Sequence, residues 1–497
     1  MSDQLPLSWD EYARHDATGL SELVRKGLVS PAELARQAKA AVEKINPEIN
    51  AVIEVFDDVV AEPGKDGMNP AGPFYGVPMM MKDLGSRMKG RVQESGYAWR
   101  SDCVAEADDP LTENFRNAGF NLLGRTTAPE DGMAGVTESI KFGITRNPWD
   151  LGYSPGGSSG GSAAVISAGI LPACSASDGG GSIRLPASWT GLIGLKCTRG
   201  RLPLPYGLNE ATIPSSVEGV LTRTVRDTAA IYDAISYKPP GSGFMPYPAV
   251  RSLLDELSAT PKKFRIALAT GNWSRRDSLP AEYRSRTLQI AQWLEQEGHS
   301  VEEVEEADIC DFEQLFLNYK LANWLVPLGN AIPAFAQELR VNLTKENTSR
   351  QVLQAIEAAR PYSINDLAAA QSASALTTRQ WGRFWERGYD LLLTPTLGDR
   401  CPRVQSEKYA LASEQSFDDF FDHCMDLCRY TMPGNEVGLP AISLPAGLDD
   451  NGLPQGVQFY APWSGECDLI HIAAQLESMK PEYFNRLGQH NVMQLTS

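Results

Sequence analysis

Short apolar runs alternate with amphipathic stretches along most of the chain. A short apolar run bounded by turn residues predicts a buried strand, and apolar residues at helical spacing predict a helix. Strands that alternate with helices indicate an α/β sheet covered by helices on both faces. The predicted strands are 51–56, 76–83, 120–123, 191–196, 264–269, 389–393 and 439–445, and the clearest helices are 111–118, 225–235 and 280–297.

The clearest helix start lies at Ser30. The Ser30 side chain can cap the helix, Pro31 suits its first position, and Glu33 can complete a capping box. Apolar residues at helical spacing follow. Asn46-Pro47 is expected to end this helix.

The second half of the chain is mostly helical in pattern between residues 311 and 390. Its aromatic residues are expected to lie mainly in the core, with a minority lining a substrate pocket. They include Phe316, Tyr319, Trp324, Trp381, Phe384 and Trp385. The acidic run 302–308 indicates a solvated edge, and His423-Cys424-x-x-x-Cys428 lacks the partner cluster of a zinc site, so no metal is predicted.

Composition narrows the class of partner. The chain has 497 residues, 42% of them hydrophobic and 22% charged, as in an ordinary globular protein. A formal charge of −17 without a Lys/Arg cluster argues against nucleic acid or an anionic membrane as the main partner. The first residues lack the basic and apolar regions of a signal peptide, and the eight cysteines are scattered, so we expect a cytoplasmic protein.

The longest uncharged run, 151–177, leads into the stretch of greatest chemical interest. Its glycines, serines and Pro172 make it a poor transmembrane helix. Two glycine-serine clusters, 156–161 and 178–184, enclose apolar residues that seek a core, so this is not a flexible linker. Glycines allow the backbone to approach a ligand, and successive amides can form an anion-binding nest. A serine in such a nest has oxyanion donors close at hand.

The candidate base for such a serine is a lysine. The five histidines lie in no motif that indicates a base, and no Gly-x-Ser-x-Gly elbow of the hydrolase type stands in a convincing strand–turn–helix context. A lysine can act instead if its pKa falls from ~10.4 towards neutrality through burial. Lys82, at the end of the apolar run 77–81, is the lysine best placed for this, although a lysine at a strand end more often reaches solvent.

Taken together, these motifs resemble the amidase signature family of Ser–Ser–Lys amide hydrolases. The resemblance covers most of the chain and is strongest over 75–230 and 430–460. It is carried by Gly76-Val77-Pro78, Lys82-Asp83, 156–161, 178–187, Gly194-Leu195-Lys196 and Pro433-x-Asn435-x-x-Gly438-x-Pro440-Ala441.

The resemblance implies an amidase signature fold with a large central mixed sheet and helices on both faces. One domain would span 1–497. It would comprise a mainly helical segment 1–70, a signature core 75–230, a variable and substrate-lining segment 240–430, and a C-terminal return to the core, 431–497.

The same resemblance implies roles for three side chains. Ser182 matches the nucleophile, Ser158 the bridging serine that passes the proton, and Lys82 the base. The bridging serine of the family follows a cis peptide bond, so Gly157–Ser158 is expected to be cis.

The loop around the nucleophile also has implied roles. Asp178 and Arg184 match residues that support the loop by charge pairing, and no cofactor is implied. Tyr153 stands where relatives often have arginine, and Gly179 where threonine is common. The implied oxyanion hole is formed by the backbone amides of Gly179, Gly180, Gly181 and Ser182.

The predicted activity is hydrolysis of a small carboxylic amide through an acyl-enzyme. The alternatives are the A subunit of a tRNA-dependent amidotransferase, which passes ammonia to a partner, and a non-catalytic binding protein. Retention of Lys82, Ser158 and Ser182 argues against the non-catalytic protein, and the acidic charge and the weak fit outside the signature argue against the amidotransferase subunit. Stretches 146–152 and 185–188 resemble the branch that contains 6-aminohexanoate cyclic-dimer hydrolase, yet linear, aryl and cyclic amides all stay open. A homodimer is expected on base rate.

Overall fold

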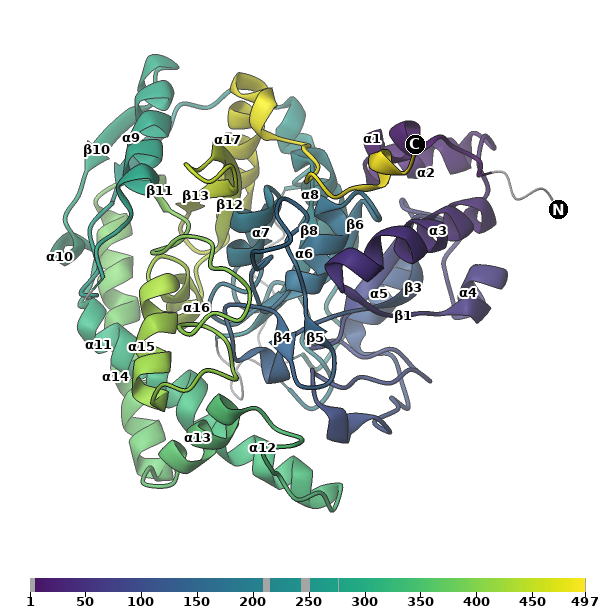
Figure 1. The fold of residues 1–497 in the computed structure, drawn as a ribbon. Coiled ribbons are helices and arrows are strands. Elements are labelled where there is room, and N and C mark those ends of the chain that lie inside the picture. Colours follow the sequence, from purple (N-terminus) through teal and green to yellow (C-terminus); the bar gives the residue numbers. More distant parts are fainter. Residues whose placement is uncertain (1–4, 209–214, 243–250, 276, 497) are drawn as a thin grey trace.

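An eleven-stranded mixed sheet forms the centre of the computed structural model, which describes residues 5–208, 215–242, 251–275 and 277–496 (Figure 1). The strand order is β1-β3-β2-β6-β8-β7-β12-β13-β11-β9-β10. The prediction of an α/β fold with a large mixed sheet is confirmed. The strands are β1 (Val52–Val55), β2 (Pro78–Lys82), β3 (Asn121–Thr126), β6 (Ala173–Asp178), β7 (Ile193–Lys196), β8 (Val217–Thr222), β9 (Arg265–Leu268), β10 (Ser300–Glu303), β11 (Leu391–Pro395), β12 (Ala441–Leu448) and β13 (Pro454–Tyr460), with β4 (Glu138–Ser139) and β5 (Gly143–Ile144) forming a separate pair.

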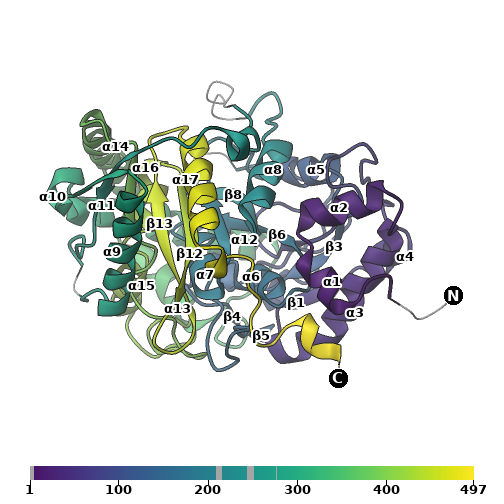
Figure 2. The same cartoon turned by 90° about the horizontal axis from the view of Figure 1, so that it is seen from above.

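Helices cover both faces of this sheet. Figure 2 shows α6 and α7 on one side and α8 and α17 on the other, and each of them contacts the strands beneath it. The helices are α1 (Trp9–Arg14), α2 (Ala17–Arg25), α3 (Pro31–Ile49), α4 (Asp57–Ala61), α5 (Pro110–Asn117), α6 (Gly160–Ser167), α7 (Arg184–Thr190), α8 (Val225–Ile235), α9 (Ala281–Gln296), α10 (Glu306–Ile309), α11 (Phe312–Tyr319), α12 (Val326–Glu338), α13 (Arg350–Ala359), α14 (Ile364–Glu386), α15 (Phe417–Leu427), α16 (Met432–Val437) and α17 (Glu466–Met479). A π-helical turn, η4 (Lys320–Leu325), joins α11 to α12, and short 3₁₀ turns are η1 (Ala98–Arg100), η2 (Glu130–Gly132), η3 (Asp255–Ser258), η5 (Pro481–Tyr483) and η6 (Val492–Thr496).

The pairing of β2 with β6 places the two glycine-serine clusters beside the candidate lysine. β2 runs parallel to both β3 and β6, and Met80 lies opposite Cys174. Carboxyl ends of parallel strands meet at the same edge of a sheet, where ligands commonly bind. Lys82 ends β2 and Asp178 ends β6, so both lie at that edge.

The end of α3 differs from the prediction. Ser30 forms the expected capping box, but the helix continues through Pro47 to Ile49 and ends at Asn50, whose φ of 48° is left-handed. A proline this close to the last turn removes one backbone donor without preventing the turn. The Asn46 side chain then accepts from the two backbone amides after Asn50, each at 2.8 Å, and leads the chain into β1.

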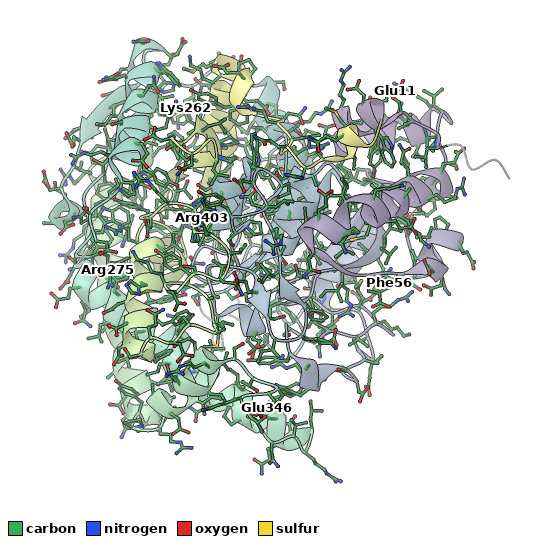
Figure 3. The ribbon with its side chains drawn as sticks, viewed as in Figure 1. Glu11, Phe56, Lys262, Arg275, Glu346 and Arg403 are labelled. Carbon is green, nitrogen blue, oxygen red and sulfur yellow. The ribbon has the colours of Figure 1, made fainter. Side chains whose placement is uncertain are left out.

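Segment 240–430 also builds part of the sheet. It supplies β9, β10 and β11, and β10 is an edge strand. Its Glu302 and Glu303 side chains are exposed, in agreement with the solvated edge expected for the acidic run, whereas Val301 packs against the core. Helices α11 to α16 form an aromatic-rich core beside these strands, in which Trp381 and Phe384 are buried as expected. Arg275, labelled in Figure 3, pairs with Asp422 and Asp426 of α15 and ties this layer together.

No helix among the described residues is long and apolar enough to cross a membrane.

Candidate active site

Lys82 contacts two serine hydroxyls. Its Nζ lies 2.8 Å from Ser158 Oγ and 2.9 Å from Ser177 Oγ, and the side chain is only 2% exposed. Burial lowers the pKa of Lys82 to about 7, although the carboxylates of Glu218 and Asp178 act to raise it. At neutral pH a large fraction of this amine is therefore uncharged and able to accept a proton.

Ser175 and Ser177 support the lysine from β6. The Lys82 backbone amide donates to Ser175 Oγ at 2.7 Å, and Ser177 Oγ accepts a hydrogen bond from Lys82 Nζ. No role was predicted for these two serines. The sequence sign that could have revealed them is their spacing: they lie two residues apart in the run before Asp178, and residues two apart on a strand share one face.

The peptide bond between Gly157 and Ser158 is cis, as expected. A Cβ at Gly157 would lie 2.7 Å from the Ala134 carbonyl oxygen, so only glycine fits there. Ser159, the next residue, donates to the Ser177 carbonyl at 3.2 Å and fastens the first cluster to the end of β6.

The second cluster winds around the carboxylate of Asp178. That carboxylate accepts from the amides of Gly181 at 2.7 Å and Ile183 at 3.1 Å, and from Arg184 Nε at 3.0 Å. Asp178 and Arg184 are both fully buried. Burial acts to raise the pKa of Asp178, but the Arg184 guanidinium outweighs it and holds that pKa at about 2. The loop is thus built around a buried ion pair.

Two residues of the C-terminal segment complete this pair. Asn435 of α16 donates to Asp178 Oδ1 at 2.8 Å and accepts from Arg184 Nη2 at 2.6 Å. Gln458 of β13 accepts from Arg184 Nη1 at 2.8 Å. Asn435 stands in one of the motifs quoted above, whereas no sequence signal marked Gln458.

The amides of the loop divide into two groups. Those of Gly179, Gly180 and Ser182 have no hydrogen-bond acceptor among the described residues, and these three residues are partly exposed. The Gly181 amide, which the resemblance implied as a fourth oxyanion donor, is instead engaged by Asp178. An anion placed over the loop would therefore find three free donors.

Only the first link of the implied relay is formed in the structure. Ser158 Oγ lies against Lys82 Nζ, whereas the Ser182 hydroxyl makes no hydrogen bond within the part of the chain that is described. The loops that carry the two serines do touch, because a Cβ at Gly156 would lie 2.6 Å from Leu185 Cδ2.

Tyr153 and Gly179, the two residues that depart from the family pattern, have different surroundings. The Tyr153 ring faces the guanidinium of Arg403 at 4.8 Å, and Figure 3 labels Arg403 near the middle of the molecule. A Cβ at Gly179 would meet no atom within 4 Å. Gly179 therefore borders open space next to the candidate nucleophile.

Other candidate groups are engaged elsewhere. Burial lowers the pKa of Lys196 to about 7 as well, but its Nζ donates to the Cys197 carbonyl at 3.0 Å. His423 is hydrogen-bonded to Gln415 at 2.8 Å. Across the described ranges, no group of three or more His, Cys, Asp or Glu residues could hold a metal ion.

Comparison with known proteins places the chain in a family. The family model described as Amidase matches residues 33–470. The 6-aminohexanoate-cyclic-dimer hydrolase of Paenarthrobacter ureafaciens is 34% identical over 482 residues, covering 94% of this chain and 95% of that protein. A solved structure of 6-aminohexanoate cyclic dimer hydrolase superposes with a TM-score of 0.88 at 32% identity, covering 96% of this chain and 99% of the other. A bacterial aryl acylamidase structure follows with a TM-score of 0.82 at 26% identity, covering 96% and 98% of the two chains. The chain is therefore an enzyme of the amidase signature family, and it is similar to the branch that its motifs indicated.

Proposed function

We propose that this enzyme hydrolyses a carboxylic amide through an acyl-enzyme on Ser182. The observation that carries the proposal is the contact of 2.8 Å between buried Lys82 and Ser158, at the sheet edge where the amides of Gly179, Gly180 and Ser182 have no acceptor among the described residues. An amide is a stable bond, so its cleavage needs an activated nucleophile, an oxyanion site and a proton for the leaving amine.

Acylation uses all three elements. Neutral Lys82 accepts the Ser158 proton, Ser158 accepts the Ser182 proton, and Ser182 Oγ attacks the amide carbonyl carbon. The carbonyl oxygen becomes an oxyanion that the unpaired loop amides stabilise. The C–N bond then breaks, and the amine leaves with the proton returned through Ser158. The second link of the relay closes when substrate binds, since catalytic hydrogen bonds often tighten only in the complex.

Deacylation repeats the relay with water. Water gives a proton to Ser158, whose own proton passes to Lys82, and the water oxygen attacks the ester carbonyl carbon. Collapse of the second oxyanion breaks the bond to Ser182 Oγ and releases the carboxylic acid. The proton returns to Ser182 Oγ and restores the starting state. The cycle consumes only the amide and water, and it leaves the three side chains in their starting protonation states.

We infer the substrate class from the relatives. Two similar proteins are named 6-aminohexanoate-cyclic-dimer hydrolases, which makes a cyclic or linear aliphatic amide the first class to test. The eight cysteines of the chain are free thiols, which supports a reducing compartment such as the cytoplasm.

The test is release of amine or ammonia from cyclic, linear aliphatic and aryl amides and from glutamine. Ser182→Ala is expected to lower kcat by at least about 10⁴-fold. Ser188→Ala is the matched control, because this buried serine lies six residues on and its hydroxyl makes no hydrogen bond among the described residues. Equal turnover by wild type and Ser182→Ala would contradict the proposal. Turnover of glutamine alone would favour the amidotransferase alternative.

A further inference from the structure

Two hydroxyl groups from outside the 178–184 loop hold its carbonyl groups. The Tyr319 hydroxyl donates to the Gly179 carbonyl at 2.8 Å, and Thr431 Oγ1 donates to the Gly180 carbonyl at 2.7 Å. Tyr319 lies 140 residues along the chain from its partner, and Thr431 lies 251 residues from its own. Neither contact belongs to the Lys82–Ser158 relay.

A held carbonyl also directs the next amide. In a trans peptide, the C=O of one residue and the N–H of the next point in opposite directions. Tyr319 therefore aims the Gly180 amide away from itself, and this is one of the amides without an acceptor among the described residues. Thr431 orients the Gly181 amide in the same way, and that amide donates to Asp178 and anchors the loop.

Steric contacts show that both hydroxyls pack directly on the loop. A Cβ at Gly180 would lie 2.6 Å from the Tyr319 hydroxyl oxygen, and a Cβ at Gly181 would lie 2.4 Å from Thr431 Oγ1. A Cβ at Gly179 would meet nothing within 4 Å. Tyr319 and Thr431 therefore cover the loop at Gly180 and Gly181, whereas the space next to Gly179 is open.

The local structure keeps Tyr319 in place as a donor. It is the last residue of α11, where the helix passes into the π-helical turn η4. Its side chain is 2% exposed, and burial raises the pKa of its hydroxyl well above the ordinary value. The hydroxyl therefore stays protonated throughout the neutral range. π-helical turns inside helices are frequent at functional sites.

We propose that Tyr319 and Thr431 are positioning residues of the oxyanion hole: Tyr319 aims the Gly180 amide at the oxyanion, and Thr431 holds the next peptide plane, whose Gly181 amide anchors the loop to Asp178. This inference rests on the proposed amide hydrolysis. The reason is that an oxyanion hole works by preorganisation, because its donors must already point at the developing charge. A peptide plane flanked by glycines rotates easily. The two hydroxyls remove that freedom for Gly179 and Gly180.

The test compares Tyr319→Phe with a matched control. Tyr12→Phe is that control, because Tyr12 is also 2% exposed and its hydroxyl donates to a backbone carbonyl, that of Ile170, at 2.8 Å. Both variants lose one buried hydrogen bond of the same kind, so a similar fall in melting temperature is expected. Only Tyr319→Phe should lower kcat, by about tenfold, with KM and the pH profile unchanged.

A second pair of variants and a binding measurement sharpen the test. Thr431→Val should lower kcat in the same way, and Thr431→Ser, which keeps the hydroxyl, should recover most of that loss. An aldehyde analogue of the substrate adds Ser182 Oγ to its carbonyl carbon and places an oxygen over the loop. Its affinity should fall in Tyr319→Phe by the same factor as kcat, while affinity for the carboxylic acid product should not change.

The possible failures are distinguishable. An inactive wild type, or an active Ser182→Ala variant, would overturn the proposed function and this inference with it. An active wild type with Tyr319→Phe equal to Tyr12→Phe in kcat and aldehyde affinity would overturn the inference alone. If Thr431→Ser lost as much rate as Thr431→Val, the hydroxyl would not be the group that matters, and Thr431 would not be a positioning residue.

Discussion

Lys82 shows how burial and nearby charge compete at a single residue. Removal from water disfavours the ammonium form, whereas the carboxylates of Glu218 and Asp178 favour it. Asp178 is already paired with Arg184, which weakens its effect on the lysine. Burial is the larger influence and brings the pKa of Lys82 to about 7. A base whose pKa lies near the working pH transfers protons most efficiently.

The first prediction concerns the pH profile. Below pH 7 the Lys82 amine is protonated and cannot accept the Ser158 proton. The ratio kcat/KM should therefore fall with decreasing pH by about tenfold per unit, with an apparent pKa of about 7. Steady-state kinetics from pH 5 to 9 on one amide would measure it. A profile that stays flat down to pH 5 would contradict the role of Lys82.

A second prediction concerns Glu218. Burial raises the pKa of this carboxyl to about 8, and its charged form raises the pKa of Lys82. Near pH 7 only a minority of Glu218 carries that charge, and Glu218→Gln removes it while keeping the shape, so the acid limb of the pH profile should move slightly to lower pH. Glu477→Gln, which alters a half-buried carboxyl on α17, is the control and should leave the limb in place. A limb that moves to higher pH in Glu218→Gln would refute this coupling.

At the scale of elements, the 178–184 loop depends on one buried ion pair. Asp178 and Arg184 are fully buried, and their remaining hydrogen-bonding groups are satisfied by loop amides and by Asn435 and Gln458. Breaking a buried pair is costly because it leaves one charge without compensation. The loop should therefore be rigid as long as both partners are present.

The third prediction follows from that pair. Arg184→Met should lower the free energy of unfolding by about 3–5 kcal/mol, because Asp178 is left charged and buried. Arg14→Met is the control, because the Arg14–Asp10 pair is 75% and 47% exposed, and it should cost less than about 1 kcal/mol. Denaturant unfolding of both variants would measure the difference. A loss in Arg184→Met no larger than the control would contradict the loop's dependence on this pair.

Local patterns predicted strands β1, β2, β3, β7, β9, β11 and β12, whereas β6, β8 and β13 were missed although they are buried in the sheet. The helix α8 (Val225–Ile235) was predicted with the bounds it has, since its capping and periodicity are local. The end of α3 was misplaced because Pro47 was given more weight than the Asn46 side chain that closes the helix. Edge strand β10 had no apolar run to reveal it, because three of its four side chains are exposed.

The candidate site likewise contains residues that local motifs predicted and residues that they did not. Lys82 and Ser158 were marked by motifs, and the structure shows them in contact. Gln458 and Tyr319 carry no local signal. Each acts on the loop through a fold that brings together residues 274 and 140 positions apart. Such contacts depend on the tertiary arrangement, which no local pattern contains.

At the scale of the whole molecule, the strand order interleaves distant segments of the chain. β12 and β13 from the C-terminal segment lie between β7 of the signature core and β11 of segment 240–430. β11 in turn pairs with both β13 and β9. The C-terminal strand β12 joins the two parts of the sheet, because it pairs with β7 on one side and with β13 on the other.

The fourth prediction is therefore a single unfolding transition. Because each segment needs its neighbours in the sheet, tryptophan fluorescence and far-UV circular dichroism should give the same midpoint in denaturant. Separate folding units would instead give two midpoints, or a fluorescence change before the loss of helical signal. Two separated transitions would refute the dependence of the segments on one another.

The measurement that tests the central claim most directly is identification of the acylated residue. A slowly hydrolysed ester of a linear aliphatic acid, quenched in acid during turnover, should leave the acyl group on one peptide in mass spectrometry. The account predicts that this peptide contains Ser182, and that Ser182→Ala shows no adduct. It also predicts that Lys82→Ala acylates far more slowly at the same residue. Turnover with an adduct on another residue, or with none under conditions in which deacylation limits the rate, would contradict the proposed mechanism.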